Sequence, residues 1–465
     1  MKRTDSIIIC SLFCVVGIYL GRYVDIRLEL FLLGLLVALV AKKKTFALTL
    51  GVALVFCAVG NHRGLIQHEG YETLRSSFET KTTITGRSLD DAEYDSRGQL
   101  AFSMNSVDIN GQRIPGQVAV SGFGEVGVLR GDLVEVTGKV FPARGSNQAR
   151  VSYAQLDVIE HDSQWYNSLR RKLNKRLRDN LPEPLSSFAG GLLIGQKSTI
   201  PDAIISNLRV SGLAHIIAVS GYNLTIIVRF VMRALKRLSR YQKLMISFSI
   251  ITVFLLITGF SASIVRAAIV CGLSLFAWYY GRTFRPAVLL SVSALVTTFY
   301  RPEYVWGDAG WYLSFLAFTG ILLVSPIIKQ RVYGDKNPKL IGGLLVETTS
   351  VLIMVTPYSL YLFGTLSLVA LVANLLVVPL IPLAMALSAV TIFIPASLAV
   401  FTTPANAVLS IILELARITA SIPNASMTID ITLLEMYVMY ICFAAAFYLM
   451  WNISGKRLEG NILVQ

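Results

Sequence analysis

The segment at 211–230, "SGLAHIIAVSGYNLTIIVRF", places ionisable side chains in an apolar run long enough to cross a membrane. His215 and Arg229 lie in this segment, and Arg266 lies in a second apolar segment, "TGFSASIVRAAIV" at 258–270. Because ionised groups are costly in hydrocarbon, such residues generally face a water-filled cavity or a partner. These segments therefore indicate either a polar passage through the membrane or a set of buried polar contacts.

The arrangement of these polar residues depends on whether the segment at 211–230 is one helix. In an unbroken helix at about 100° per residue, one narrow stripe contains Ser211, His215, Tyr222 and Arg229. That helix would place Asn223 among apolar side chains, whereas a break between Ser220 and Gly221 would expose backbone groups to a cavity. Hydrogen bonds to neighbouring helices are the alternative for a polar face of this kind. We interpret the stripe as the lining of a polar passage.

The composition places these segments in a membrane protein. Of the 465 residues, 54% are hydrophobic and only 15% are charged, whereas about a quarter of the residues of a soluble domain are charged. The net charge of +14 is typical of a chain whose cytoplasmic loops are rich in Lys and Arg. A polyanionic substrate is the alternative explanation of that charge.

Three short apolar blocks at 6–20, 28–40 and 45–59 predict three N-terminal spans, the first of them an uncleaved span rather than a signal peptide. If the basic residues at 2–3 and 42–44 are cytoplasmic, the third span leads to the outside.

The region at 72–162 is polar, and period-2 alternation predicts strands at 81–88, 99–109, 116–122, 132–140 and 149–159. Five short strands with glycine-rich turns favour a small OB-like barrel.

Two readings of this strand region stay open. OB folds often bind single-stranded nucleic acid, but the region is not basic and carries an acidic cluster of Asp90, Asp91, Glu93 and Asp95. A folded extracytoplasmic domain without nucleic-acid contact is the alternative. The segment at 165–181 that follows is a basic amphipathic helix, which predicts either a helix lying on the membrane or a basic collar at a pore entrance.

The remaining sequence predicts a bundle of membrane spans joined by alternately basic and non-basic loops. The predicted spans are at 244–260, 264–280, 286–300, 309–328, 340–362, 366–392, 399–421 and 431–452. The fold class expected is a polytopic α-helical membrane protein with a small extracytoplasmic β-barrel (OB-like) domain inserted after three N-terminal spans. The predicted parts are 1–60, the N-terminal spans; 61–163, the β domain; 164–182, the interfacial helix; 183–455, the channel domain; and 456–465, a cytoplasmic tail.

Five segments in order resemble the signature segments of the ComEC competence family, the inner-membrane DNA channel of natural transformation. They are "GLLIGQKSTIP", "SGLAHIIAVSGYNLTIIV", "TGFSASIVRAAIV", "DAGWYLSFLAFTGI" and "LVANLLVVPLIP", within 185–395. The resemblance implies translocation of single-stranded DNA inward across the bacterial cytoplasmic membrane. One departure is Asn223, where the family often has a histidine.

The resemblance and the residues together give a set of candidate residues for the DNA path. The set is His215, Ser220, Gly221, Tyr222, Asn223, Arg229, Ser263, Arg266, Asp308, Trp311 and Asn374. Arginines would meet phosphates, and Tyr222 and Trp311 are candidates for stacking on bases. Asp308 would be a structural or gating partner of a buried cation. Ser220, Gly221, Ser263 and Asn374 would hold a broken-helix geometry.

We expect no enzymatic activity, no metal and no cofactor. The four histidines form no two-metal cluster, and "GGLLIGQKS" lacks the spacing of an ATP-binding loop. Relatives often carry a metallo-β-lactamase-like domain that is not encoded here. The expected partners are single-stranded DNA, membrane lipids, a DNA receptor protein, a helicase or ATPase motor and a separate nuclease, and a homo-oligomer stays open. The alternative function is transport of another polyanion or a small solute on the same scaffold, and a membrane hydrolase is a weaker reading.

Overall fold

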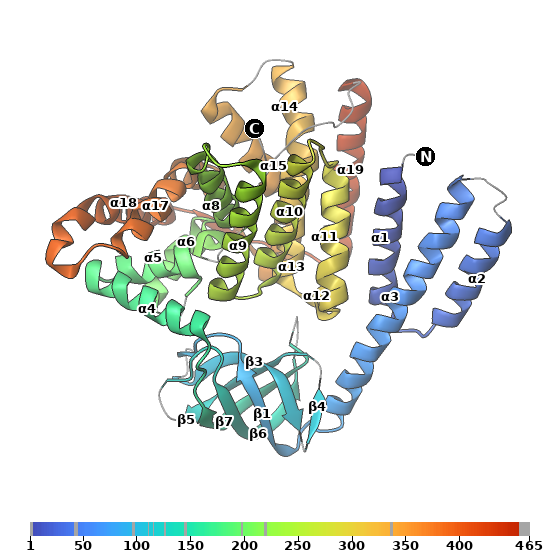
Figure 1. Cartoon of the computed structure of the whole chain (residues 1–465), viewed down its shortest axis with the longest axis horizontal. Helices are drawn as coiled ribbons and strands as arrows, with labels where there is room; N and C mark the ends of the chain where they lie inside the picture. Colours follow the sequence, from blue (N-terminus) through green and yellow to red (C-terminus); the bar gives the residue numbers. More distant parts are fainter. Residues whose placement is uncertain are drawn as a thin grey trace. The chain divides into compact units, whose positions relative to one another are not determined.

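The computed structural model describes residues 3–40, 45–94, 98–109, 111–114, 116–124, 127–143, 147–196, 199–217, 221–334 and 338–454. Of the residues discussed above, Lys2, Lys42–Lys44, Asp95, Ser220 and the tail at 456–465 lie outside these ranges. The described part is mostly helical, with one large sheet and eight helical segments long and apolar enough to cross a membrane (Figure 1). The chain is therefore a polytopic membrane protein.

The chain divides into two compact units, which are described separately. The first unit comprises Met1–Ser168 and Val288–Tyr312, and the second comprises Leu169–Ala287 and Leu313–Gln465. The helices of the first unit are α1 (Arg3–Leu20), α2 (Arg27–Val40), α3 (Thr45–Arg75), α11 (Pro286–Tyr300) and α12 (Glu303–Gly307). Helix α3 continues well beyond the apolar run that ends near Val59, so the predicted boundary at residue 60 falls inside a helix.

Helices α1 and α3 pack backbone against backbone through glycines spaced four residues apart: Gly17 in α1 and Gly21 just after it, and Gly60 and Gly64 in α3. A Cβ atom at Gly17 would lie 2.0 Å from the Cys57 carbonyl oxygen, and one at Gly60 would lie 2.1 Å from the Cys14 carbonyl oxygen. Small residues at this spacing let membrane helices approach closely and gain dispersion contacts that larger side chains would prevent. The α1–α3 contact therefore depends on the absence of side chains at these positions.

The sheet of the first unit contains seven strands, and its five long strands coincide with the five predicted ones. The strands are β1 (Lys81–Ser88), β2 (Glu93–Tyr94), β3 (Leu100–Ile109), β4 (Gln112–Ile114), β5 (Val118–Gly124), β6 (Leu133–Pro142) and β7 (Ala149–Glu160). Their order is β1-β6-β7-β5-β3-β2, and β1 also pairs with β3, so the pairing of the long strands returns to its starting strand. All pairs are antiparallel except β5 with β7. The alternate side chains, among them Ile84, Met104 and Val136, form one buried core.

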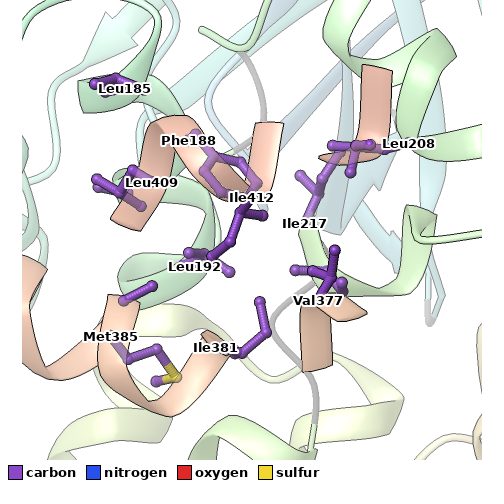
Figure 2. Packing of buried hydrophobic residues seen from close by; sticks show 14 of the residues in the cluster. Leu185, Phe188, Leu192, Leu208, Ile217, Val377, Ile381, Met385, Leu409 and Ile412 are labelled. Carbon is purple, nitrogen blue, oxygen red and sulfur yellow. The ribbon is translucent and has the colours of Figure 1, made fainter. Parts of the chain in front are cut away.

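The remaining helices lie in the second unit, except that α4 and α13 begin in the first. They are α4 (Trp165–Asn180), α5 (Leu185–Ile194), α6 (Asp202–Val210), α7 (Ala214–Ile217), α8 (Gly221–Ala234), α9 (Arg240–Thr258), α10 (Ala262–Tyr279), α13 (Ala309–Thr319), η1 (Gly320–Val324), α14 (Ser325–Tyr333), α15 (Leu340–Phe363), α16 (Ala370–Val377), η2 (Val378–Leu380), α17 (Ile381–Thr391), η3 (Ala396–Thr402), α18 (Thr403–Ala420) and α19 (Leu433–Ser454). Strands β8 (Thr365–Ser367) and β9 (Ser426–Thr428) pair with each other. Figure 2 shows the core, where Phe188 and Leu192 of α5 meet Val377, Ile381 and Ile412 of the later helices.

Part of the apolar face of helix α4 packs against this core. Leu177 and Leu181 are buried in it, and the Asn180 side chain donates hydrogen bonds of 2.7 and 2.8 Å to the carbonyl oxygens of Thr391 and Ile394. The C-terminal half of the stripe therefore packs on protein. Contact with the membrane surface stays a prediction for the other half, where Trp165 is exposed.

Replacing Gly60 by alanine tests the α1–α3 packing. We expect Gly60→Ala to lower the stability of the folded chain by about 1–3 kcal/mol, because its methyl group would overlap the Cys14 carbonyl. The measurement is the thermal unfolding midpoint of the purified protein in detergent. The matched control is Gly343→Ala in α15, where a Cβ atom would meet only a Pro338 carbon at 3.8 Å. Equal midpoints for both variants would contradict the packing argument.

Candidate functional site

The segment at 211–230 begins in a turn and not in a helix. Helix α6 ends at Val210, Gly212 adopts a left-handed φ of 73°, and α7 begins at Ala214. The turn is fixed by a contact from outside the segment, because Ser367 donates a 2.7 Å hydrogen bond to the Val210 carbonyl oxygen. Helix α8 is described from Gly221 onward, and the alternative of a break between Ser220 and Gly221 falls on residues 218–220, outside the described part.

Within α8, the candidate residues divide between a buried and an exposed face. Asn223 is buried, and its side-chain nitrogen donates a 3.0 Å hydrogen bond to the Leu192 carbonyl oxygen of α5. Tyr222 is 46% exposed and Arg229 is also exposed. Because seven residues make almost two helical turns, Tyr222 and Arg229 share one face of α8. Asn223 thus has a hydrogen-bond partner on the buried face of α8, and the exposed face carries an aromatic ring and a cation.

His215 lies on α7, outside this face. Its side chain is exposed, whereas the two isoleucines that follow it are buried in the core of the second unit. The predicted stripe is shown only for Tyr222 and Arg229, because residues 218–220, which join α7 to α8, lie outside the described part.

The structure gathers three candidates, Gly221, Ser263 and Arg266, at the start of helices α8 and α10, which lie side by side (Figure 1). Arg266 is 8% exposed, and one of its terminal nitrogens, Nη2, lies 3.1 Å from the position that a Cβ atom would take at Gly221. The guanidinium carbon lies 4.6 Å from the centre of the Phe318 ring, a cation–π contact. Ser314 donates a 3.1 Å hydrogen bond to the Ser263 hydroxyl.

The other three candidates take part in local contacts. The Asn374 side chain is buried and donates a 2.7 Å hydrogen bond to the Ala370 carbonyl oxygen of its own helix. Asp308 and Trp311 belong to the first unit, where the Asp308 carboxylate accepts a 2.6 Å hydrogen bond from the Trp311 backbone at the start of α13. The Trp311 ring is buried and donates a 3.0 Å hydrogen bond to the Thr297 hydroxyl. Its indole face therefore lies in a packed interior, which does not favour the predicted stacking on a base.

The sequence analysis missed a polar cluster in the first unit, between the predicted spans at 286–300 and 309–328. Gln67 of α3 donates a 3.2 Å hydrogen bond to Glu303 of α12, whose second carboxylate oxygen is buried without a hydrogen-bond partner. Arg63 donates to the carbonyl oxygens of Phe299 and Tyr300 at 3.1 and 3.3 Å. Arg63 and Gln67 follow the apolar run of α3 about one helical turn apart, and this spacing could have indicated that the helix continues with a polar face.

The same cluster reaches the sheet through Arg301. With the Gln117 amide oriented so that its oxygen faces the guanidinium, both terminal nitrogens of Arg301 donate to it, at 2.6 and 2.7 Å. Gln117 directly precedes β5, and the Arg301 guanidinium also lies 5.6 Å from the centre of the Tyr304 ring. The loop between α11 and α12 is thereby bonded to the residue that precedes β5 of the sheet.

Two exposed aromatic side chains on the sheet were also missed. Phe123 on β5 and Tyr153 on β7 are 55% and 64% exposed. Tyr153 has a φ of 54° and lies where the register between β5 and β7 shifts by one residue. A bulky side chain in this left-handed conformation is strained, and such strain occurs often at functional positions. Outward-facing aromatics in "GFG" and "VSYAQ" could have been noticed from strand alternation.

Among the residues that the structure describes, no group of three or more His, Cys, Asp or Glu side chains is placed to hold a metal ion. The chemistry available at the gathered residues is therefore electrostatic attraction, hydrogen bonding and ring stacking.

The Glu303 carboxyl gives this cluster a pH dependence. Burial raises the pKa of Glu303 above its ordinary value, so the Glu303 carboxyl binds its proton more tightly in the folded protein than in the unfolded chain. Protonation of Glu303 therefore stabilises the fold. This contribution is complete below the ordinary carboxyl pKa of about 4.3 and is lost as the pH rises through the folded-state pKa.

We therefore expect Glu303→Gln to unfold at a higher temperature than the parent protein at about pH 8, with the difference shrinking toward about pH 4. Thermal unfolding midpoints across this pH range provide the measurement. Glu69→Gln, an exposed position on the same α3 helix, is the control and should follow the parent curve. A Glu303→Gln variant that is less stable than the parent at every pH would refute the argument.

Comparison with known proteins places the second unit in a family. A family profile described as "Competence protein" matches residues 192–454, which is more than half of the chain. A stretch of 214 residues is 24% identical to "ComE operon protein 3" of Bacillus subtilis (strain 168), and it covers 46% of this chain and 27% of that protein. The chain thus aligns with about a quarter of that relative's length. No solved structure matches this chain significantly.

Proposed function

The chain belongs to the competence protein family, and we propose that it carries single-stranded DNA inward across the bacterial cytoplasmic membrane during natural transformation. One observation carries the proposal: the family match at 192–454 contains α8, whose exposed face carries Tyr222 and Arg229, together with the buried Arg266. Ionisable side chains within membrane segments generally face a water-filled cavity or a partner.

The exposed face of α8 supplies the groups that a single strand needs. A strand of phosphates requires a hydrated, electropositive path, and aromatic rings can stack on its bases. Arg229 would bind phosphates and Tyr222 would stack on a base, two turns apart on the same face. His215 would lie beside this path, while Ser220, Gly221, Asn223, Ser263 and Asn374 would keep the helices interrupted and packed.

We infer that the sheet domain is an OB-like barrel. The circuit β1-β3-β5-β7-β6 and the parallel pairing of β5 with β7 support this assignment. We place the domain on the extracytoplasmic side, because the basic loops of the chain are expected in the cytoplasm. There, Phe123 and Tyr153 would offer an exposed aromatic surface to incoming DNA.

The proposed transport assigns no catalytic step to this chain. The work of moving a polyanion would come from a partner ATPase or from an ion gradient. A DNA receptor protein would deliver the substrate, and a separate nuclease would supply any strand degradation.

The α8 face is tested by uptake of labelled DNA in a deletion strain complemented with variants of this chain. We expect Arg229→Ala to reduce uptake by roughly tenfold, because a charge-assisted contact to phosphate is lost. Arg237→Ala, an exposed arginine after α8, is the matched control and should support normal uptake at equal expression. Normal uptake by Arg229→Ala and by a Tyr222→Ala, Arg229→Ala double variant would remove the α8 face from the path. Normal uptake in the deletion strain itself would favour transport of another polyanion or a small solute.

The aromatic surface of the sheet domain is tested by DNA binding. We expect Phe123→Ala and Tyr153→Ala each to weaken binding of a thymidine oligonucleotide by the full chain in nanodiscs by about 1–3 kcal/mol. Fluorescence anisotropy at low salt provides the measurement. Ile159→Ala, an exposed aliphatic residue on β7, should bind as the parent does. If neither aromatic variant differs from Ile159→Ala, the sheet domain has no stacking role.

A further inference from the structure

An ion pair joins two membrane-spanning segments of the second unit. Lys329 of α14 donates a 2.6 Å hydrogen bond to the Glu347 carboxylate of α15, and the two side chains are 31% and 46% exposed. Both residues fall inside segments long and apolar enough to cross a membrane, Ala309–Tyr333 and Ile341–Phe363. Because charged groups are costly in hydrocarbon, partly exposed charges in such segments generally face water or the interior of the bundle.

This ion pair lies near the exposed face of α8. The Tyr222 hydroxyl interacts electrostatically with both Arg229 and Glu347, so the carboxylate lies within electrostatic range of that face. Arg233, one turn beyond Arg229, is exposed on the same face. The surface formed by α8, α14 and α15 is therefore mainly cationic, and Glu347 places an acid among its cations.

The charged groups lie at similar depths in their helices. Arg229 precedes the end of α8 by five residues, Lys329 precedes the end of α14 by four, and Glu347 follows the start of α15 by seven. At 1.5 Å per residue, these positions are about 6–11 Å from the helix ends. The segments at those ends, 233–243 and 329–339, are basic and are expected in the cytoplasm. The charges therefore belong to the expected cytoplasmic half of the bundle.

Close backbone packing holds the two partners of the ion pair in register. Gly320 of η1 lies against α15, because a Cβ atom there would be 2.8 Å from the Ser350 carbonyl oxygen. Ser350 is about one helical turn from Glu347, and η1 continues directly into α14, which carries Lys329. The element η1 is a π-helix, a form found frequently at functional sites.

A carboxylate among these cations has a physical use in a path for a polyanion. While the path is empty, a cation in a membrane segment needs a counter-charge, and the Glu347 carboxylate supplies it to Lys329. Carboxylate and phosphate oxygens accept the same charge-assisted hydrogen bond from an ammonium group. A phosphate can therefore take the place of the carboxylate on Lys329 without any new kind of contact.

We propose that Glu347 is a resident counter-ion of the translocation path, which occupies Lys329 in the empty protein and is displaced when a phosphate of the strand binds there. The inference rests on the proposed function, because the displacing group is a polyanion. After displacement, the Glu347 carboxylate repels the phosphate that replaced it. The strand is thereby bound weakly enough at this point to move on, as conduction requires.

Binding of a fluorescent thymidine oligonucleotide by the full chain in nanodiscs tests this role. We expect Glu347→Gln to bind it roughly tenfold more tightly than the parent, since Lys329 no longer has to release a carboxylate. The slope of log K against log salt should steepen by about 0.7, because no freed carboxylate takes up a cation when the strand binds. The matched control is Glu414→Gln, which removes the acid of the exposed Glu414–Arg417 pair in α18 and should bind as the parent does.

The gain must depend on Lys329. In a Lys329→Met background, Glu347→Gln should bring little further gain in affinity. Equal affinities of the parent and Glu347→Gln, or an equal gain in Glu414→Gln, overturn the proposal. If Glu347→Gln does not fold, Glu347→Asp keeps the charge but draws the carboxylate back by one methylene group. That variant should still bind the oligonucleotide more tightly than the parent, and an unchanged affinity would overturn the role of Glu347.

Uptake of labelled DNA separates this inference from the transport proposal. Normal uptake in the deletion strain contradicts DNA transport by this chain and, with it, the role of Glu347. Uptake that requires the chain, combined with equal oligonucleotide affinities of the parent and Glu347→Gln, leaves the transport proposal standing and removes only the resident counter-ion.

Discussion

A polar group surrounded by apolar protein or hydrocarbon must find a partner within the protein, and this constraint organises both units of the structure. Buried asparagines meet it with backbone carbonyls: Asn223 bonds to Leu192, and Asn180 bonds to Thr391 and Ile394. The bonds to Leu192 and Thr391 each join two helices, so the cost of burying an amide helps to fix which helices are neighbours. Glu303, Arg266 and Asn180 itself meet the same constraint only in part, because each keeps a buried side-chain atom without a hydrogen-bond partner.

Close packing of helix backbones fixes which elements are neighbours in the first unit. Glycines let α1 and α3 touch along several turns, and this contact supports α3 far beyond its apolar run. The extended part of α3 carries Arg63 and Gln67 to the α11–α12 region. Arg301 in that region donates hydrogen bonds to Gln117, which directly precedes β5 of the sheet. The sheet domain is thus held both by its covalent link to α3 and by a polar contact from a segment nearly two hundred residues later in the sequence.

The elements with strong periodic patterns could be predicted from the sequence, and the elements set by tertiary contacts could not. The strands at 81–88 and 149–159 and the span at 286–300 were placed within a residue or two, because burial alternates along them or extends all round them. The extension of α3 was missed because its second half is polar, and polarity indicates a loop unless a partner helix is known. The turn at the start of the segment at 211–230 packs Gly212 against Ala370, a residue far away in sequence. For the same reason, the burial of Arg266 beside Gly221 and the packing of Trp311 against Thr297 required coordinates.

The position of β7 in the sheet sets the order in which that domain is completed. Strand β7 lies between β5 and β6 and pairs with both, although it is the last strand in the chain. Until residue 160 has been synthesised, β5 and β6 each lack the neighbour that covers one edge, and such uncovered edges are prone to wrong pairing. Non-local closure of this kind also slows folding, because loop entropy is lost before the contacts that compensate for it have formed. The basic helix α4, which follows directly, therefore emerges only when every long strand of the sheet is available to close the circuit.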